Sequence, residues 1–303
     1  MKYAFIVIFI FFTNAFAQTI IENARFGEQG QQPGQFSNPN ALSISPDGTL
    51  YIVDTGNSRI QLFTLKGRFI RSVGGFGFKN DQFDKPYDIW TRSVLNFYIA
   101  DYENQRVVRY DKNMNFISAL ESTESGNPDF IFREISSVAV NSQNELFLLE
   151  HGENKIIKYD RNGNAERIFG AYQSGTGSLV EPHQLEIQGI DKIIISDRGK
   201  KALIVFDFFG NYIKHIQSEE FVAPAGLAVD QQFRVYVADP GAAAVFRIDP
   251  ALTEITKLDL KLDIPLKAPA DLAVWKEPGQ EQKTYKVYIL DGHELIIGNL
   301  MDE

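Results

Sequence analysis

Short apolar runs separated by turn residues recur along the whole chain. In the first complete stretch they are ALSIS (41–45), TLYIVD (49–54), RIQLFTL (59–65) and RFIRSVG (68–74). Pro-Asp-Gly, Thr-Gly-Asn-Ser and Lys-Gly stand between these runs. Runs of this length that are rich in Ile, Val, Phe and Tyr predict strands, and the residues between them predict tight turns. The 3.6-residue periodicity of helical repeats is absent, so the pattern predicts antiparallel meanders.

The same unit occurs six times, as the spacing of one acidic residue indicates. The acid that follows the second apolar run is Asp54, Asp101, Glu150, Asp197, Asp239 and Asp291, at steps of 47, 49, 47, 42 and 52 residues. A proline stands 15 residues before the acid in four units, and Ile135 takes its place in the third. In the sixth unit EPGQEQKT (277–284) lengthens a turn. Four strands in each of six such units predict an all-β, six-bladed β-propeller with four-stranded antiparallel blades.

The two ends of the chain are expected to close the ring. The sixth unit offers three strands only, PADLAV (269–274), YKVYILD (285–291) and ELIIGNL (294–300). Residues 20–36, which precede the first unit, are similar to residues 68–83, an outer strand with its linker. We therefore expect residues 20–27 to supply the fourth strand of the last blade, which would remove an exposed strand edge.

The units resemble NHL repeats. The strings that carry the resemblance are FSNPNALSISPDGTLYIVDTGNSRIQLF (36–63) and FDKPYDIWTRSVLNFYIADYENQRVVRY (83–110), and weaker copies cover the rest of the chain. Proteins of this type are typically six-bladed propellers, so the resemblance implies the fold that the six units indicate. Some relatives of this type are intracellular ubiquitin-ligase scaffolds with zinc-binding domains, but this chain contains no cysteine.

The N-terminus has the pattern of a secretory signal peptide. Lys2 is followed by the apolar run 5–12 and then by Ala15-Phe16-Ala17, an Ala-x-Ala cleavage pattern. The expected organisation is a signal peptide at 1–17 and one propeller at 18–303. A secreted or periplasmic location follows, with no membrane insertion, because the apolar run is too short to span a bilayer.

Composition narrows the classes of partner. The chain is 44% hydrophobic and carries a formal net charge of −9. The apolar content suffices for a large core, and the acidic balance argues against nucleic acid, whose binding depends on neutralising phosphates. We expect a monomer that needs no cofactor, with a protein, a peptide or a cell-envelope glycan as its partner.

The repeated acid-x-x-Asn-x-Arg string favours a structural interpretation. Asp and Asn side chains bond to turn backbones, and an Arg two residues later can bridge to a carboxylate. A binding site is instead expected where the units differ, on the face that carries the first-strand starts and the second-to-third-strand turns. We name it the start face. Its candidate ligand-binding residues are Asn40, Tyr87, Asp88, Tyr102, His151, His183, Arg198 and Asp271.

Histidines at this face raise the alternative of a metal enzyme. The string EPHQLEI (181–187) resembles a Pro-His motif of the peptidyl-hydroxyglycine amidating lyases, propellers in which several histidines hold a catalytic zinc. Here His183 alone occupies such a position, so neither the zinc site nor the lyase activity is carried over. Asn40, Asp88 and Asp271 also make a lactonase-like metal site conceivable. No catalytic residue and no metal ligand is assigned.

These observations predict a rigid binding scaffold that contacts its partner through the face around the central channel. The alternative is a metal-dependent enzyme, lyase-like or lactonase-like, built around His183, His151 and nearby carboxylates.

Overall fold

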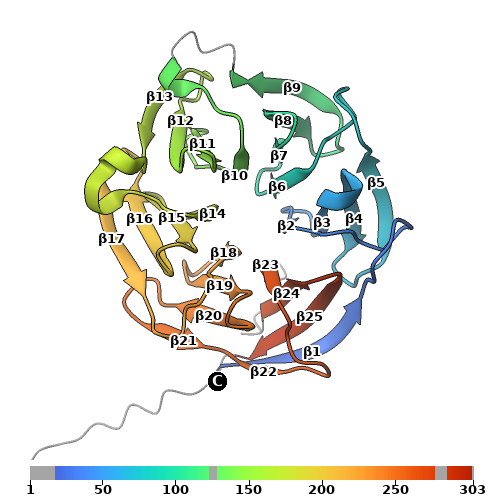
Figure 1. The fold of residues 1–303 in the computed structure, drawn as a ribbon. Coiled ribbons are helices and arrows are strands. Elements are labelled where there is room, and N and C mark those ends of the chain that lie inside the picture. The colour runs from blue at the N-terminus through green and yellow to red at the C-terminus, as the bar shows by residue number, and fades with distance from the viewer. Residues whose placement is uncertain (1–17, 123–127, 277–284, 302–303) are drawn as a thin grey trace, which may run out of the picture.

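The computed structural model describes residues 18–122, 128–276 and 285–301. Its sheets stand like the blades of a fan around one axis (Figure 1), and five of them have four strands while the sixth has five. The predicted all-β, six-bladed propeller is confirmed. Within these ranges, no helix has the length and apolar character needed to cross a membrane. The predicted signal peptide and the insertion at 277–284 lie outside the described residues.

Each of the first five blades is a consecutive meander from the axis outwards. Blade 1 comprises β2 (Ala41–Ile44), β3 (Thr49–Asp54), β4 (Arg59–Thr64) and β5 (Phe69–Gly74). Blade 2 comprises β6 (Pro86–Trp90), β7 (Asn96–Asp101), β8 (Arg106–Asp111) and β9 (Phe116–Glu121). Blade 3 comprises β10 (Ile135–Val140), β11 (Leu146–Glu150), β12 (Lys155–Tyr159) and β13 (Ala165–Phe169). Blade 4 comprises β14 (Pro182–Gln188), β15 (Lys192–Asp197), β16 (Ala202–Asp207) and β17 (Tyr212–Gln217). Blade 5 comprises β18 (Leu227–Val229), β19 (Val235–Asp239), β20 (Ala244–Ile248) and β21 (Ile255–Lys257).

Blade 6 joins the two ends of the chain, as predicted. It contains β23 (Pro269–Trp275), β24 (Tyr285–Asp291), β25 (Glu294–Met301) and β1 (Thr19–Phe26). The N-terminal strand β1 pairs antiparallel with β25, with Ile20 opposite Leu300. In Figure 1 the blue β1 lies beside the red β25, which shows the first and last strands of the chain in one sheet.

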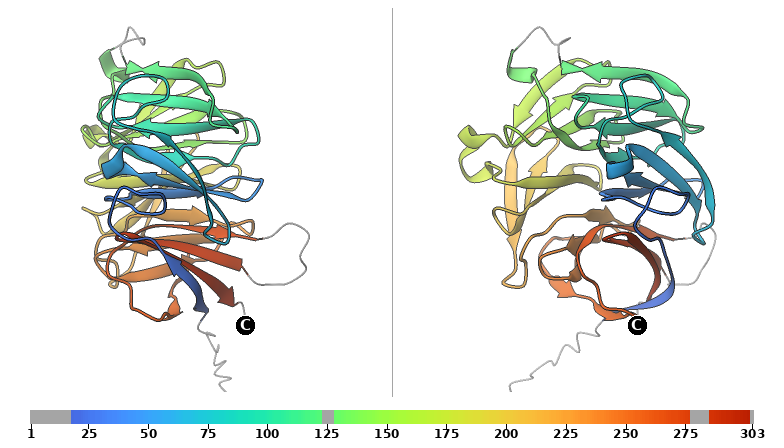
Figure 2. Two further views of the ribbon diagram at one scale, coloured as in Figure 1. Left: turned by 90° about the vertical axis from the view of Figure 1, so that its right-hand side faces the viewer. Right: turned by 45° about the vertical axis from the view of Figure 1, so that its right-hand side comes forward.

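A fifth strand in this blade is a departure from the four-stranded prediction. After β21 the chain crosses to blade 6 as β22 (Asp259–Lys261), which pairs parallel with β1 on its outer side. Blade 5 thereby fastens the outer edge of blade 6, so β1 has partners on both sides. Figure 2 shows the same region edge-on, with β1 and the orange segment of β22 together at the lower rim.

Short 3-10 turns occupy some of the connections. They are η1 (Thr55–Asn57), η3 (Pro128–Phe130) and η4 (Tyr172–Gly177).

The core consists of apolar layers between neighbouring blades. The described residues form six buried clusters, and each cluster combines side chains of two adjacent blades. For example, Tyr51 of blade 1 packs edge-on against Phe97 of blade 2, with their ring centroids 5.3 Å apart. Inner strands are therefore covered on both faces, which explains why β10 is buried at every position. Outer strands such as β17 alternate between exposed and more buried residues. Because each blade needs two neighbours, the ring must close.

The repeated acid holds each inter-blade linker to its blade. In all six blades the acid is nearly inaccessible, and its carboxylate accepts backbone N–H groups from the segment that leads into the first strand. In blade 1, Asp54 accepts the N–H of Ser37 at 2.7 Å. Because these groups are buried, leaving one N–H unpaired would cost on the order of 1–3 kcal/mol.

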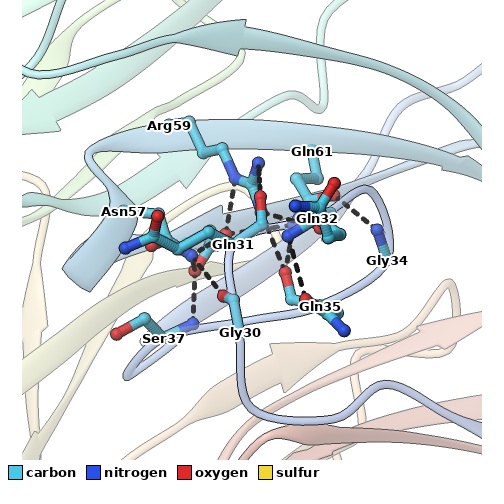
Figure 3. Close-up of polar contacts among 10 residues, drawn as sticks. Gly30, Gln31, Gln32, Gly34, Gln35, Ser37, Asn57, Arg59 and Gln61 are labelled. Carbon is cyan, nitrogen blue, oxygen red and sulfur yellow. Dashed lines mark hydrogen bonds and ion pairs between the residues drawn. The ribbon is translucent and has the colours of Figure 1, made fainter.

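The Asn and Arg of the string complete the same support, as Figure 3 shows for blade 1. Asn57 donates to Asp54 and to the carbonyl of Gly30 at 2.9 Å. Arg59 donates to Asp54 at 2.7 Å and to the carbonyls of Gln31, Gln32 and Gln35. Arg106 repeats these contacts in blade 2. The structural interpretation of the repeated string therefore agrees with the contacts seen.

Ring closure should depend on the inward face of β1. Ile20 is fully buried in the layer between blades 5 and 6, whereas Ile21 is 40% exposed. Replacing Ile20 with Ala should lower the free energy of unfolding by about 2–5 kcal/mol, because it leaves a cavity in this layer. Urea denaturation followed by circular dichroism measures the change, with Ile21→Ala as the matched control. Equal effects of both substitutions would contradict the closure role of β1.

The Arg106–Asp101 pair should be a strong contributor to stability. Arg106 is 2% exposed, and its Nε lies 2.8 Å from the Asp101 carboxylate. Arg106→Ala removes the counterion of that buried carboxylate and the donor to three linker carbonyls, so we expect a loss of about 3–5 kcal/mol. Chemical denaturation tests this, and Lys85→Ala, which breaks the exposed pair with Glu103, should leave the midpoint near that of the wild type. A small effect of Arg106→Ala would show that the linker is held by other contacts.

Candidate functional site

A ring of side chains around the axis links four of the six blades to the next one. These side chains lie two residues after the proline position, and they are Ala41, Asp88, Ser137, Gln184, Gly226 and Asp271. Four of them accept the backbone N–H at the following position of the next blade. The bonds run from Val138 to Asp88 (3.0 Å), from Leu185 to Ser137 (3.1 Å), from Leu227 to Gln184 (2.5 Å) and from Leu42 to Asp271 (2.8 Å).

Asp88 and Asp271 follow the two blades that lack a side-chain acceptor in this ring. Blades 1 and 5 carry Ala41 and Gly226, which have no side-chain acceptor for the next blade. Each following blade supplies its own aspartate, and the second carboxylate oxygen accepts the N–H of the next residue at 2.8 Å. Asp88 and Asp271 therefore satisfy two backbone donors each. Gly226 cannot be replaced, because a Cβ there would lie 2.4 Å from the Cα of Asp271.

Burial shifts the protonation of both acids. Asp88 is 5% exposed and Asp271 is 1% exposed. Burial raises the pKa of Asp88, whereas hydrogen bonds from Ser137, the backbone and Gln184 lower it by less. Burial also holds the pKa of Asp271 well above its usual range, and the nearby charge of Asp88 raises it further. The Gln184 side chain hydrogen-bonds to both carboxyls, so the three groups form one cluster at the axis.

A cavity of about 400 Å³ opens from this cluster towards the ends of the first strands. We name that end of the channel, where the first-to-second-strand turns lie, the exit face. Asp88 and Gln184 form the deep end of the cavity, and Pro46, Gln231 and Lys276 lie at its mouth. The only two tryptophans of the chain, Trp90 and Trp275, both line it. The aromatic walls and the polar deep end suit a side chain or small ligand.

An ion pair spans the mouth of the cavity. Arg92 of blade 2 reaches across to Glu186 of blade 4, with Nη1 3.1 Å from Oε1. Burial raises the pKa of Glu186, the charge of Arg92 lowers it, and the charge of Asp88 raises it. The same pair borders a second hollow of about 510 Å³ over blades 2 to 5.

Exposed apolar side chains surround this second hollow on the exit face. Val94, Leu95, Ile190 and Phe233 are 65%, 68%, 75% and 50% exposed, respectively, and all four lie in first-to-second-strand turns. Val94 and Phe233 line the hollow itself. We name these four residues the exit rim. Clusters of exposed apolar residues beside a cavity are typical of interaction surfaces.

Five of the sequence-predicted residues come together at the start face. The rings of Tyr87 and Tyr102 lie 5.2 Å apart, and the rings of Tyr87 and His183 lie 6.0 Å apart. Burial lowers the pKa of His183 well below its usual range, and the charges of Arg198 and His151 add to this shift. His183 is therefore a neutral imidazole near pH 7.

The other three predicted residues lie closer to the axis. Asn40 donates to the carbonyl of Tyr87 at 2.9 Å, and Asp88 and Asp271 belong to the inter-blade ring. Of the eight predicted residues, Asp88 lines the cavity of the exit face. That all eight bind a ligand stays a prediction.

The prediction missed the cavity walls, although the repeat carried a signal for them. Trp90 and Glu186 stand four residues after the proline position, where the other blades have Ser or Ala. Arg92 and Trp275 stand two residues further along. Trp and Glu at a position that is otherwise Ser or Ala mark the part of the channel where the units differ.

The possible metal ligands of the site do not form a cluster in the part of the chain that the structure describes. Among the described residues, no group of three or more His, Cys, Asp or Glu side chains is arranged to hold a metal ion. His151 and His183 do lie near each other, but Nδ1 of His151 is 3.3 Å from the carbonyl of Pro182.

Comparisons with known sequences point to NHL repeats. The NHL repeat model matches residues 36–63, from the linker before blade 1 into β4. Protein brain tumor of Drosophila melanogaster is 25% identical over 155 residues, which are 50% of this chain and 14% of that protein. The B-box type zinc finger protein ncl-1 of Caenorhabditis elegans is 26% identical over 154 residues, 50% of this chain and 17% of that protein. The human E3 ubiquitin-protein ligase NHLRC1 is 24% identical over 130 residues, 43% of this chain and 33% of that protein. The matches thus span a third or less of these relatives.

Solved structures agree in fold. A streptogramin B lyase structure superposes with a TM-score of 0.63 at 11% identity, covering 92% of this chain and 97% of that one. A catalytically inactive virginiamycin B lyase from Staphylococcus aureus with quinupristin gives 0.62 at 13% identity, covering 92% and 99%. A protein of unknown function from Bacteroides thetaiotaomicron gives 0.65 at 14% identity, covering 92% and 76%. Identities this low support the shared architecture and no shared activity.

The buried acid Asp271 should make stability fall as the pH rises. Its folded-state pKa lies above its unfolded value of about 4, so the folded state binds the extra proton. The free energy of unfolding is therefore highest below the unfolded-state pKa and declines as the pH rises to the folded-state pKa. The total decline is about 1.4 kcal/mol for each unit by which the two pKa values differ. In Asp271→Asn this decline should be smaller. Urea denaturation at several pH values between 4 and 8 measures it.

A surface variant controls for the change in net charge. Asp191→Asn removes a largely exposed carboxylate and should keep the wild-type dependence on pH. If Asp271→Asn follows the wild-type curve in parallel, the carboxyl of Asp271 is ionised in the folded protein at these pH values.

Proposed function

We propose that this chain is a binding module that takes a segment of a partner protein into the central cavity from the exit face. The observation that carries the proposal is the cavity itself, about 400 Å³ in volume and lined by both tryptophans. Trp side chains that line a pocket are frequent anchors of binding energy. The exit rim beside it supplies apolar area for a flanking segment.

A protein or peptide partner is favoured over a glycan. One relative is an E3 ubiquitin-protein ligase, a class of enzymes that act on proteins, and it is 24% identical to this chain over 130 residues. The exposed valine, leucine, isoleucine and phenylalanine of the exit rim suit apolar side chains of a peptide better than the hydroxyl groups of a sugar.

The location of the protein belongs to the same proposal. The apolar run and the Ala15-Phe16-Ala17 pattern support a secreted or periplasmic protein with a signal peptide at 1–17. The partner would then be an extracellular or cell-envelope protein. The start-face cluster around Tyr87 and His183 is a second candidate contact surface.

A selection with displayed random peptides tests the proposal. Peptides selected on the wild-type protein should bind Trp275→Ala at least about tenfold more weakly, because an anchoring wall of the cavity is lost. Tyr102→Ala, on the start face, should keep the wild-type affinity. Isothermal titration calorimetry measures both, and circular dichroism confirms that the variants fold.

Two results would overturn the proposal. If no peptide is selected, the protein is not a peptide-binding module of this kind. If Tyr102→Ala or His151→Ala abolishes binding while Trp275→Ala does not, the partner contacts the start face instead.

A further inference from the structure

Two acids that line the cavity and a third acid buried beside it influence one another. Asp88 and Glu186 line it, and Asp271 is buried beside Asp88. The charge of Asp88 acts on both Asp271 and Glu186. Glu186 lies two residues beyond Gln184 on β14, so the acids occupy two successive levels along the channel, about 7 Å apart.

Two cationic side chains, Arg92 and Lys276, also line the cavity, but neither forms an ion pair with Asp88 or Asp271. Arg92 pairs with Glu186, and its side chain is 37% exposed. Among the described residues, no ion pair joins Asp88 or Asp271 to a Lys or Arg side chain. At the mouth, Asp230 pairs with Arg234, while the ammonium group of Lys276 lies 5.8 Å from the centre of the Tyr285 ring. Asp88 and Asp271 therefore have hydrogen-bond donors but no counterion.

The aromatic walls are independent of the acids and favour the same ligand charge. Trp90 comes from blade 2 and Trp275 from blade 6, and both line the cavity. The face of an indole ring attracts cations more strongly than other aromatic rings do. Carboxyl groups at the deep end disfavour an anion, because its charge would lie beside theirs in a site of low dielectric constant.

We propose that the group entering the cavity is a cation carried on an alkyl chain, the ammonium group of a lysine or the guanidinium group of an arginine in the partner segment. This inference rests on the proposed function and specifies its ligand. The cation supplies a counterion to Asp88, which lines the cavity, and its charge also acts on Asp271, which is buried beside Asp88. Its alkyl chain contacts the two tryptophans.

Because both tryptophans of the chain line the cavity, intrinsic fluorescence reports on its occupancy. The probes are N-acetyl-lysine amide, N-acetyl-arginine amide, the neutral N-acetyl-norleucine amide and the anionic N-acetyl-glutamate amide. We expect the two cations to bind at least about tenfold more tightly than the neutral and anionic probes. Their affinity should rise with pH by up to about tenfold per unit for each proton displaced from the acids.

Two substitutions of the mouth ion pair should act in opposite directions. Glu186→Gln removes a carboxylate and releases Arg92, so cation affinity should fall about tenfold. Arg92→Gln leaves Glu186 without its internal partner, so cation affinity should rise. Glu103→Gln makes the same charge change as Glu186→Gln on the exposed Lys85 pair and should have no effect.

The outcomes separate this inference from the proposed function. Equal binding of the neutral probe, tighter binding of the anion, or weaker cation binding in Arg92→Gln would each overturn the cationic ligand while leaving the cavity as a binding site. If none of the probes changes the fluorescence, this inference falls, and the peptide selection alone decides whether the exit face binds a partner.

Discussion

The backbone N–H groups that face the axis impose the strictest requirement on this fold. Each innermost strand has a free edge, and its N–H donors are buried where water is scarce. The chain satisfies them by one rule, in which a side chain of each blade accepts from the next blade. Where Ala41 and Gly226 break the rule, Asp88 and Asp271 each accept two donors. The hydrogen bonds of this ring cross four of the six interfaces at the axis, and the apolar layers fasten all six interfaces further out.

This solution places negative charge where it is costly. Each carboxyl group accepts one N–H at each of its two oxygens, yet burial raises the pKa of both aspartates. The hydrogen bonds lower the cost of each charge but do not remove it. The two aspartates that replace the missing acceptors thus leave carboxyl groups without a counterion at the deep end of the cavity. A positively charged ligand can supply that counterion.

The sequence predicts what repeats and misses what depends on the neighbouring blade. Six spaced acids and the similarity of residues 20–36 to 68–83 sufficed for the blade number and for closure by β1. The strand β22 escaped prediction because three residues carry no periodicity, and its pairing is set by a distant strand. Asp88 and Asp271 were identified as unusual, but their role depends on Ala41 and Gly226 in the preceding blades. The sequence distinguishes Trp90 from the Ser or Ala of other blades, but the fold alone brings it together with Trp275 in one cavity.

The two ends of the channel differ in a way that favours different uses. At the start face, Tyr87 packs against Tyr102 and His183, and burial keeps His183 neutral, so this end is filled by its own side chains. At the exit face, small residues such as Ala273 leave room that the tryptophans and acids border without filling. The repeated string and the linkers belong to the start face, where sequence variation would disturb the scaffold. The first-to-second-strand turns do not contain the repeated string or the linkers, so their residues can vary without loss of the fold. Residues that determine specificity for a partner are therefore expected in these turns.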